Sequence, residues 1–189
     1  MKKVLLFIFV SLVLISTSSF SQNNKFAKKD QWEIGGTISF TSMTPVSSGE
    51  TGKSTSVFRL APSAGFFVVE SVELGLLVDF TSYSYGGGSS YSDCSFFFAP
   101  AYNFRTNSIS YPYVQGQIGF TFQSGGSGSS NDPSGLAWGV EGGVKLNVTG
   151  SGLAKIGINY SQRTLNTSNS TSRNGYNTVS IVLGLGLFL

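Results

Sequence analysis

The sequence predicts an all-β protein: an eight-stranded antiparallel up-and-down transmembrane β-barrel that follows a cleaved N-terminal signal peptide. Three observations predict this fold. Apolar residues alternate with small or polar residues over most of the chain. The connections between the alternating segments are by turns long and short, and every charge inside those segments lies on the same face. We therefore expect strands with one apolar face throughout the chain after the signal peptide.

The stretch Val57–Tyr83 shows the alternation most clearly and predicts a hairpin. The apolar face of its first half consists of Phe58, Leu60, Pro62, Ala64, Phe66 and Val68, and that of its second half consists of Val72, Leu74, Leu76, Val78 and Phe80. Each half is long enough for a strand of about 36 Å, or about 27 Å of height at a tilt of about 40°. That height matches the hydrocarbon layer of a bilayer.

Six further segments alternate in the same way and complete the set of eight predicted strands. They are Trp32–Thr41, Cys94–Phe104, Tyr111–Gln123, Gly135–Leu146, Ala154–Ser161 and Val179–Leu189. The long connections are Ser42–Ser56, Ser84–Asp93, Ser124–Ser134 and Gln162–Gly175. Transmembrane barrels have short periplasmic turns and longer extracellular loops, so we expect these four connections at the outer end. The last strand is expected to pair with the first, because open edges in lipid leave backbone groups unsatisfied.

The first 21 residues predict export. Lys2 and Lys3 precede the short apolar run Val4–Ile15, and serines at 19 and 21 favour cleavage before Gln22. The alternative is an uncleaved membrane anchor. Residues 22–31 are polar and predict a loose periplasmic leader, and residues 32–189 form the barrel domain.

Charge placement indicates which face of the strands points inward. The charges inside the predicted strands are Glu33, Arg59, Glu73, Asp79, Glu141, Lys145 and Lys155, and all lie on the small or polar face. A lipid-facing Lys or Arg at the bilayer midplane costs about 2–4 kcal/mol. Because Gly and Ser dominate this face, only this face fits a narrow interior. The bulky apolar face is therefore expected to meet lipid.

These seven residues predict a luminal charge network, because breaking a buried ion pair costs about 3–5 kcal/mol. A turn centred near Val69 places Arg59 opposite Asp79 or one diagonal step away, toward the outer end. A turn centred near Thr149 places Lys155 beside Glu141 on the diagonal. Glu33, Glu73 and Lys145 are expected to join the second pair toward the periplasmic end. In the alternative, interior water solvates each charge.

The hairpin residues Leu60–Val68 with Leu74–Leu76, the segment Phe96–Pro100 and the apolar last strand resemble the small outer-membrane β-barrel proteins of Gram-negative bacteria, the OmpA/OmpX-like group. The resemblance implies a monomeric integral outer-membrane barrel with a packed interior and no catalytic activity. It also implies contact with outer-membrane lipid and with the barrel assembly machinery through the C-terminal strand. The last residue of such barrels is commonly aromatic, whereas here Phe188 is penultimate and Leu189 is last.

Several classes of function lack the residues they need. The net charge of +3, with no basic stripe, does not favour nucleic-acid binding. The sequence contains no His, the base of acyl-transfer and hydrolytic sites, and its only cysteine is Cys94. The segment Gly49–Ser54 resembles the end of a phosphate-binding loop, but Ser47 replaces its first glycine and a strand follows. We expect no enzyme activity, no cofactor and no metal site.

Three functions remain open. The first is an outer-membrane barrel with a packed polar lumen and a structural, envelope-stabilising or surface-contact role. The second is a narrow porin-like channel for small solutes, although an eight-stranded lumen is just filled by side chains. The third is a soluble periplasmic ligand-binding barrel.

Overall fold

The computed structural model describes residues 26–43, 46–47, 50–51, 55–85, 90–106, 109–124, 133–165 and 174–189. The predicted signal peptide Met1–Ser21, its cleavage site and the start of the leader lie outside the described residues, as does the phosphate-loop-like segment except for Glu50 and Thr51. No helix among the described residues is long and apolar enough to cross a membrane.

Nine strands form one sheet, and two short strands form a separate pair. The sheet contains β1 (Trp32–Met43), β4 (Thr55–Val69), β5 (Val72–Tyr85), β6 (Ser90–Phe98), β7 (Ala101–Asn103), β8 (Ser110–Ser124), β9 (Ser134–Asn147), β10 (Gly152–Leu165) and β11 (Asn174–Phe188). The separate pair is β2 (Val46–Ser47) with β3 (Glu50–Thr51), within a segment predicted to be only a loop. Because β6 and β7 are two parts of one wall strand, the barrel has the predicted eight wall positions.

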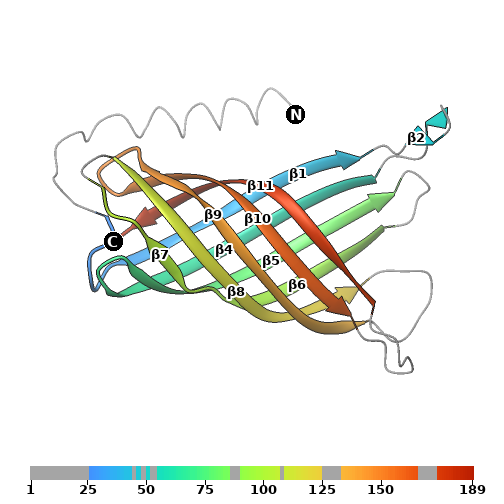
Figure 1. Ribbon diagram of the computed structural model, residues 1–189, viewed down its shortest axis with the longest axis horizontal. Helices are drawn as coiled ribbons and strands as arrows, with labels where there is room; N and C mark the ends of the chain where they lie inside the picture. Colours follow the sequence, from blue (N-terminus) through green and yellow to red (C-terminus); the bar gives the residue numbers. More distant parts are fainter. Residues whose placement is uncertain are drawn as a thin grey trace.

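The sheet closes into a barrel (Figure 1). β1 pairs antiparallel with β4 on one side and with β11 on the other, so Ile34 lies opposite both Ala64 and Leu187. Every other neighbour is also antiparallel, and the predicted pairing of the first and last strands is confirmed. We call the end at which β1 begins and β11 ends the terminal end. The opposite end, where the four long connections join the strands, is the loop end.

The predicted single strand Cys94–Phe104 is wrong in one respect, because it breaks at Ala99 and Pro100. Pro100 has no N–H to donate to a sheet ladder. The wall stays joined, since the Ala99 N–H donates to the Gly75 carbonyl at 2.8 Å and the Gly116 N–H donates to the Pro100 carbonyl at 2.9 Å. The break therefore interrupts this wall strand without opening the barrel.

The two faces of the wall are assigned as predicted. The apolar face points outward: Phe40 is 69 % exposed and Val179 is 71 % exposed. All seven predicted luminal charges point into the barrel. Among the small and polar residues that dominate the inner face, Phe67, Leu77 and Phe97 are also buried. Such large side chains fill the interior where small residues would leave space.

Candidate functional site

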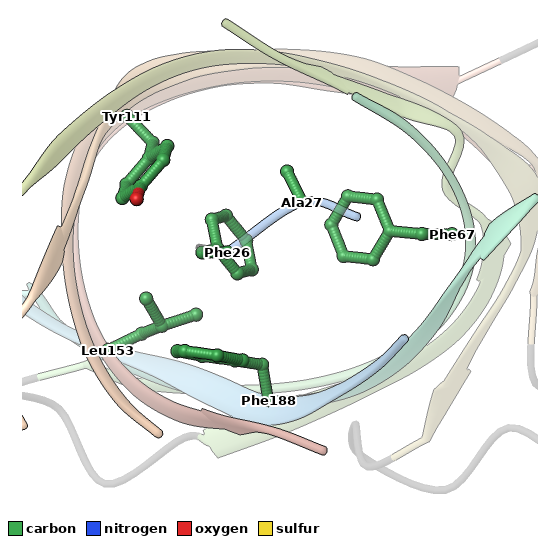
Figure 2. Close-up of a cluster of buried hydrophobic side chains, with 6 residues drawn as sticks. All are labelled: Phe26, Ala27, Phe67, Tyr111, Leu153 and Phe188. Atoms are coloured by element: carbon green, nitrogen blue, oxygen red, sulfur yellow. The ribbon is translucent and has the colours of Figure 1, made fainter. Parts of the chain in front are cut away.

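The candidate functional site is the lumen, and its terminal end is capped by the leader. Phe26 and Ala27 are completely buried inside the barrel, where they pack among Phe67, Tyr111, Leu153 and Phe188 (Figure 2). The Phe26 ring centroid lies 5.1 Å from that of Tyr111, 5.3 Å from that of Phe67 and 5.4 Å from that of Phe188. Aromatic pairs at these separations add to the stabilisation from burial alone.

Backbone hydrogen bonds hold this part of the leader in place. The Asp30 N–H donates to the Phe67 carbonyl at 2.8 Å, and the Ser71 N–H donates to the Ala27 carbonyl at 3.0 Å. Ala27 and Asp30 both have positive φ, at 64° and 66°, and so redirect the chain twice before β1 begins. The prediction of a loose leader is therefore wrong for residues 26–31, which dock into the barrel instead of trailing from it.

The first group of luminal charges contacts this cap and is centred on Lys145. The Lys145 Nζ atom lies 2.6 Å from Glu33 Oε2 and 3.2 Å from Glu73 Oε2, and all three side chains are buried. It also lies 5.3 Å from the centroid of the Phe26 ring, in the range of a cation–π contact. Asn103 donates a further hydrogen bond to Glu73 Oε2 at 3.2 Å. The cap and the charges thus form one continuous packed unit.

Gly65 lies next to this group. A Cβ atom at position 65 would lie 1.9 Å from Glu73 Oε1, so any side chain would displace the carboxylate that binds Lys145. The glycine is therefore explained by packing space inside the lumen.

The pair Glu141–Lys155 also forms, but its predicted register is wrong. Lys155 lies directly opposite Lys145, and Glu141 lies opposite Asn159, so the two partners are further apart along the strands than one diagonal step. Lys155 Nζ still reaches Glu141 Oε1 at 2.8 Å. Like charges directly opposite one another are destabilising, and here the two lysines bind different carboxylates.

Tyr113 connects the two terminal-end groups. Its hydroxyl donates to Glu141 Oε1 at 2.9 Å, and its ring centroid lies 5.3 Å from Lys145 Nζ and 5.0 Å from Lys155 Nζ. Asn159 donates to Glu141 Oε2 at 3.3 Å and to Gln117 Oε1 at 3.2 Å, which extends the hydrogen bonds toward the middle of the lumen. All the predicted terminal-end residues therefore belong to one connected network.

A second group of charges lies toward the loop end and contains the predicted pair Arg59–Asp79. Arg59 Nε donates to Asp79 Oδ2 at 2.7 Å across a diagonal of the β4–β5 ladder, where Arg59 lies opposite Thr81. Asp79 also accepts from Arg163 Nη2 at 2.9 Å and from the Thr81 hydroxyl at 2.8 Å. The pair is thus part of a larger cluster than the sequence predicted.

Four residues of this cluster were missed by the sequence analysis: Asp93, Arg163, Tyr83 and Tyr176. Arg163 Nη1 lies 3.6 Å from Asp93 Oδ2 and donates to the hydroxyls of Tyr83 at 3.2 Å and Tyr176 at 3.1 Å. Asp93 accepts from Gln123 Nε2 at 3.1 Å and from the Tyr176 hydroxyl. Both Arg163 and Asp93 were assigned to predicted loops, although each continues the inward alternation of its strand.

A cavity of about 380 Å³ lies beside this cluster at the loop end; we call it the vestibule. Its lining includes Arg59, Arg163, Tyr83, Tyr85 and Tyr176. Among the described residues, no group of three or more acidic or cysteine side chains is arranged to hold a metal ion. The vestibule lining combines tyrosine rings and two arginines with hydroxyl and amide side chains, among them Ser39, Asn159 and Ser161.

Comparisons with known proteins identify the fold. No protein-family model matches the chain, and no curated protein matches its sequence. The structure is similar to that of Neisserial surface protein A (NspA), with a TM-score of 0.60 and 19 % identity over 83 % of this chain and 96 % of that chain.

Two Pseudomonas aeruginosa barrels are also similar. For the N-terminal β-barrel domain of OprF, the TM-score is 0.52 with 16 % identity over 85 % of this chain and 98 % of that domain. For the outer membrane protein OprG, it is 0.51 with 16 % identity over 86 % of this chain and 97 % of that chain. The chain therefore has the fold of the small outer-membrane β-barrels that its sequence resembles, with a lipid-facing apolar wall around a polar lumen.

Proposed function

We propose that the protein is an integral outer-membrane β-barrel with a closed lumen, whose role is to stabilise the envelope and to present loops for surface contact. One observation carries this proposal: the leader and the Lys145 network fill the terminal end together. Phe26, Glu141 and Lys145 are each almost completely buried there. Because an eight-stranded barrel is just wide enough to be filled by side chains, such packing supports a brace inside the wall over a pore.

Membrane insertion follows from the outer surface. A soluble barrel would place polar residues outside, whereas here the outward-facing residues of β11 are apolar, including Val179, Ile181 and Leu183. Cell fractionation with heat-modifiable gel mobility tests this point. We expect the protein in the outer-membrane fraction, with a mobility shift on boiling. Recovery in the soluble periplasm would favour the soluble binding barrel instead.

The topology proposed for this role places the loop end outside the cell. Epitope tags inserted at Gly126 and Ser170 are expected to be accessible on intact cells, and a tag at Thr149 is not. The reverse pattern would invert the barrel. Contact with the assembly machinery is proposed to use the last strand, whose Phe188 ring becomes part of the interior cap after folding.

The structural role is tested in a deletion strain. Loss of the gene is expected to sensitise cells to detergent, and the wild-type chain is expected to restore resistance. If the wild-type chain restores solute uptake but not resistance to detergent, the channel is favoured instead.

The narrow porin-like channel has one observation in its favour, which is the vestibule. It gives the loop half of the lumen an opening of about 380 Å³ beside the Arg59 cluster. Conduction would still require a path past the Lys145 network and Phe26 at the terminal end. Electrical recording of the protein in a planar bilayer separates the two functions.

A further inference from the structure

We propose that the vestibule is a binding site for an uncharged sugar in its pyranose ring form. This inference goes beyond the structural role, because a closed barrel and a conducting one could both hold such a ligand at the loop end. The cavity is lined by described residues of β1, β4, β5, β6, β10 and β11. Its volume of about 380 Å³ lies at the lower end of the range for small-molecule pockets, about 300–1,000 Å³, and so suits a short ligand.

The lining contains two walls of different chemistry. On β5 and β6 it consists of the tyrosines Tyr83, Tyr85 and Tyr91. On β10 and β11 it includes the hydroxyl-bearing residues Ser161, Thr178 and Ser180. In the strand order of the barrel, β5 lies four wall positions from β10, and β6 lies four from β11. The tyrosine wall and the hydroxyl wall therefore face one another across the lumen.

The tyrosine wall offers a flat aromatic surface. Tyr83 and Tyr91 stack with centroids 4.3 Å apart, and Tyr85 continues this stack at 5.8 Å from Tyr91. Tyr85 is 40 % exposed, so part of its ring is free to contact a ligand. The face of an aromatic ring carries partial negative charge, and it attracts the weakly positive C–H groups on one face of a pyranose ring.

The hydroxyl wall offers groups that both donate and accept. In the β10–β11 ladder, Ser161 lies opposite Thr178, and Asn159 lies opposite Ser180. Thr178 and Ser180 are half-buried and line the cavity, so their side chains keep accessible surface there. Each hydroxyl has one donor and two acceptor positions, as do the hydroxyls of a sugar. A carboxylate only accepts and an ammonium group only donates, so neither uses this wall fully.

The charges at the site favour an uncharged ligand. The charged side chains in the described lining are Arg59 and Arg163. Both bind Asp79, and Arg163 also lies 3.6 Å from Asp93, so this cluster is formally neutral. A purely aromatic ligand would satisfy the tyrosines but cover the opposite hydroxyls without giving them partners, which is costly. A sugar ring supplies an apolar face and several hydroxyls together.

The test is saturation-transfer NMR with the full chain in lauryldimethylamine oxide micelles, because this detergent has no sugar headgroup. Empty micelles are the blank. The probes are the methyl pyranosides of glucose, galactose, mannose and N-acetylglucosamine. We expect saturable binding of at least one of them. If none of the four binds saturably to the wild-type protein, the proposal is overturned.

Three further compounds separate the contributions of ring and hydroxyls. Cyclohexanol keeps a six-membered ring with a single hydroxyl, sorbitol keeps the hydroxyls without a ring, and uracil is a flat ring without hydroxyls. Each is expected to bind at least about tenfold more weakly than the best glycoside. Equal affinity for any of the three would overturn the proposal.

A trisaccharide of the best-binding sugar distinguishes the two sources of this chemistry. Binding at least as tight as that of the single ring assigns the end of a glycan chain, and weaker binding assigns a free sugar. Both results support the sugar site.

Variants locate the site, with heat-modifiable mobility as the check that each one folds. Tyr85→Ala is expected to weaken glycoside binding severalfold, whereas Tyr85→Phe keeps the ring and should bind nearly as tightly as the wild type. Thr178→Val keeps the shape of the side chain without its hydroxyl and should weaken binding by about fivefold. The matched control is Tyr102→Ala, which removes a tyrosine that is 44 % exposed on the outer wall at the terminal end and should leave binding unchanged. If either Tyr85→Ala or Thr178→Val binds like the wild type, or if Tyr102→Ala weakens binding as much as Tyr85→Ala does, the vestibule is not the sugar site.

Discussion

Replacing Lys145 tests the energetic importance of the luminal network. The Lys145 side chain is 3 % exposed and is the ionic partner of two buried carboxylates, at 2.6 Å and 3.2 Å. Lys145→Met keeps most of the apolar stem but leaves Glu33 and Glu73 buried without their cation. Breaking a buried pair in this way costs about 3–5 kcal/mol, so we expect a loss of unfolding free energy in this range.

The assay is urea unfolding of the refolded barrel in lipid vesicles, followed by tryptophan fluorescence. Trp32 and Trp138 both lie on the outer wall and change environment when the barrel leaves the bilayer. Lys155→Met is the matched control. Its partner Glu141 keeps hydrogen bonds from Tyr113 and Asn159, so the loss should be smaller than that of Lys145→Met.

A second variant separates charge from packing. Adding Glu33→Gln to Lys145→Met removes one of the two unpaired carboxylates and should recover part of the lost stability. The reasoning is refuted if Lys145→Met costs less than about 1 kcal/mol, the range of an exposed ion pair. It is also refuted if the double variant is less stable than the single one.

Two further predictions concern the other parts of the lumen. Asp79→Ala should destabilise the barrel by about 3–5 kcal/mol, and adding Arg59→Ala should cost little more, because Arg59 has then already lost its partner; simple addition of the two losses in urea unfolding would show that the pair contributes nothing. Phe26→Ala should release the leader, because Phe26 is completely buried and truncating a buried Phe costs about 3–5 kcal/mol. Trypsin should then cut after Lys29 at least about tenfold faster than in the wild type, and an unchanged cleavage rate would show that Phe26 does not hold the cap.

The period of two in the sequence was sufficient to predict the wall. This period determines which residues face inward. The two turns near Val69 and Thr149 set the pairing register of the strands that they connect. The Arg59–Asp79 pair could therefore be predicted from the hairpin alone. The Glu141–Lys155 register was predicted wrongly, because a change of one residue in the turn centre moves the partner by two positions.

Other features depend on contacts between distant parts of the chain. Phe26 lies in a polar leader with no periodicity, and only the closed barrel provides the aromatic pocket that buries it. Arg163 and Asp93 lie beyond the predicted strand ends, although each continues the inward alternation of Asn159 and Ser95. Extending the alternation into the flanking polar segments would have found both residues.

Planar-bilayer recording tests the central claim, that the protein's own side chains close the lumen. A porin with a wide water-filled barrel serves as the positive control for insertion and detection. The wild-type protein is expected to insert, as judged by its heat-modifiable mobility in recovered vesicles, and to give no discrete conductance steps. Reproducible single-channel steps from the wild-type protein would contradict the closed lumen.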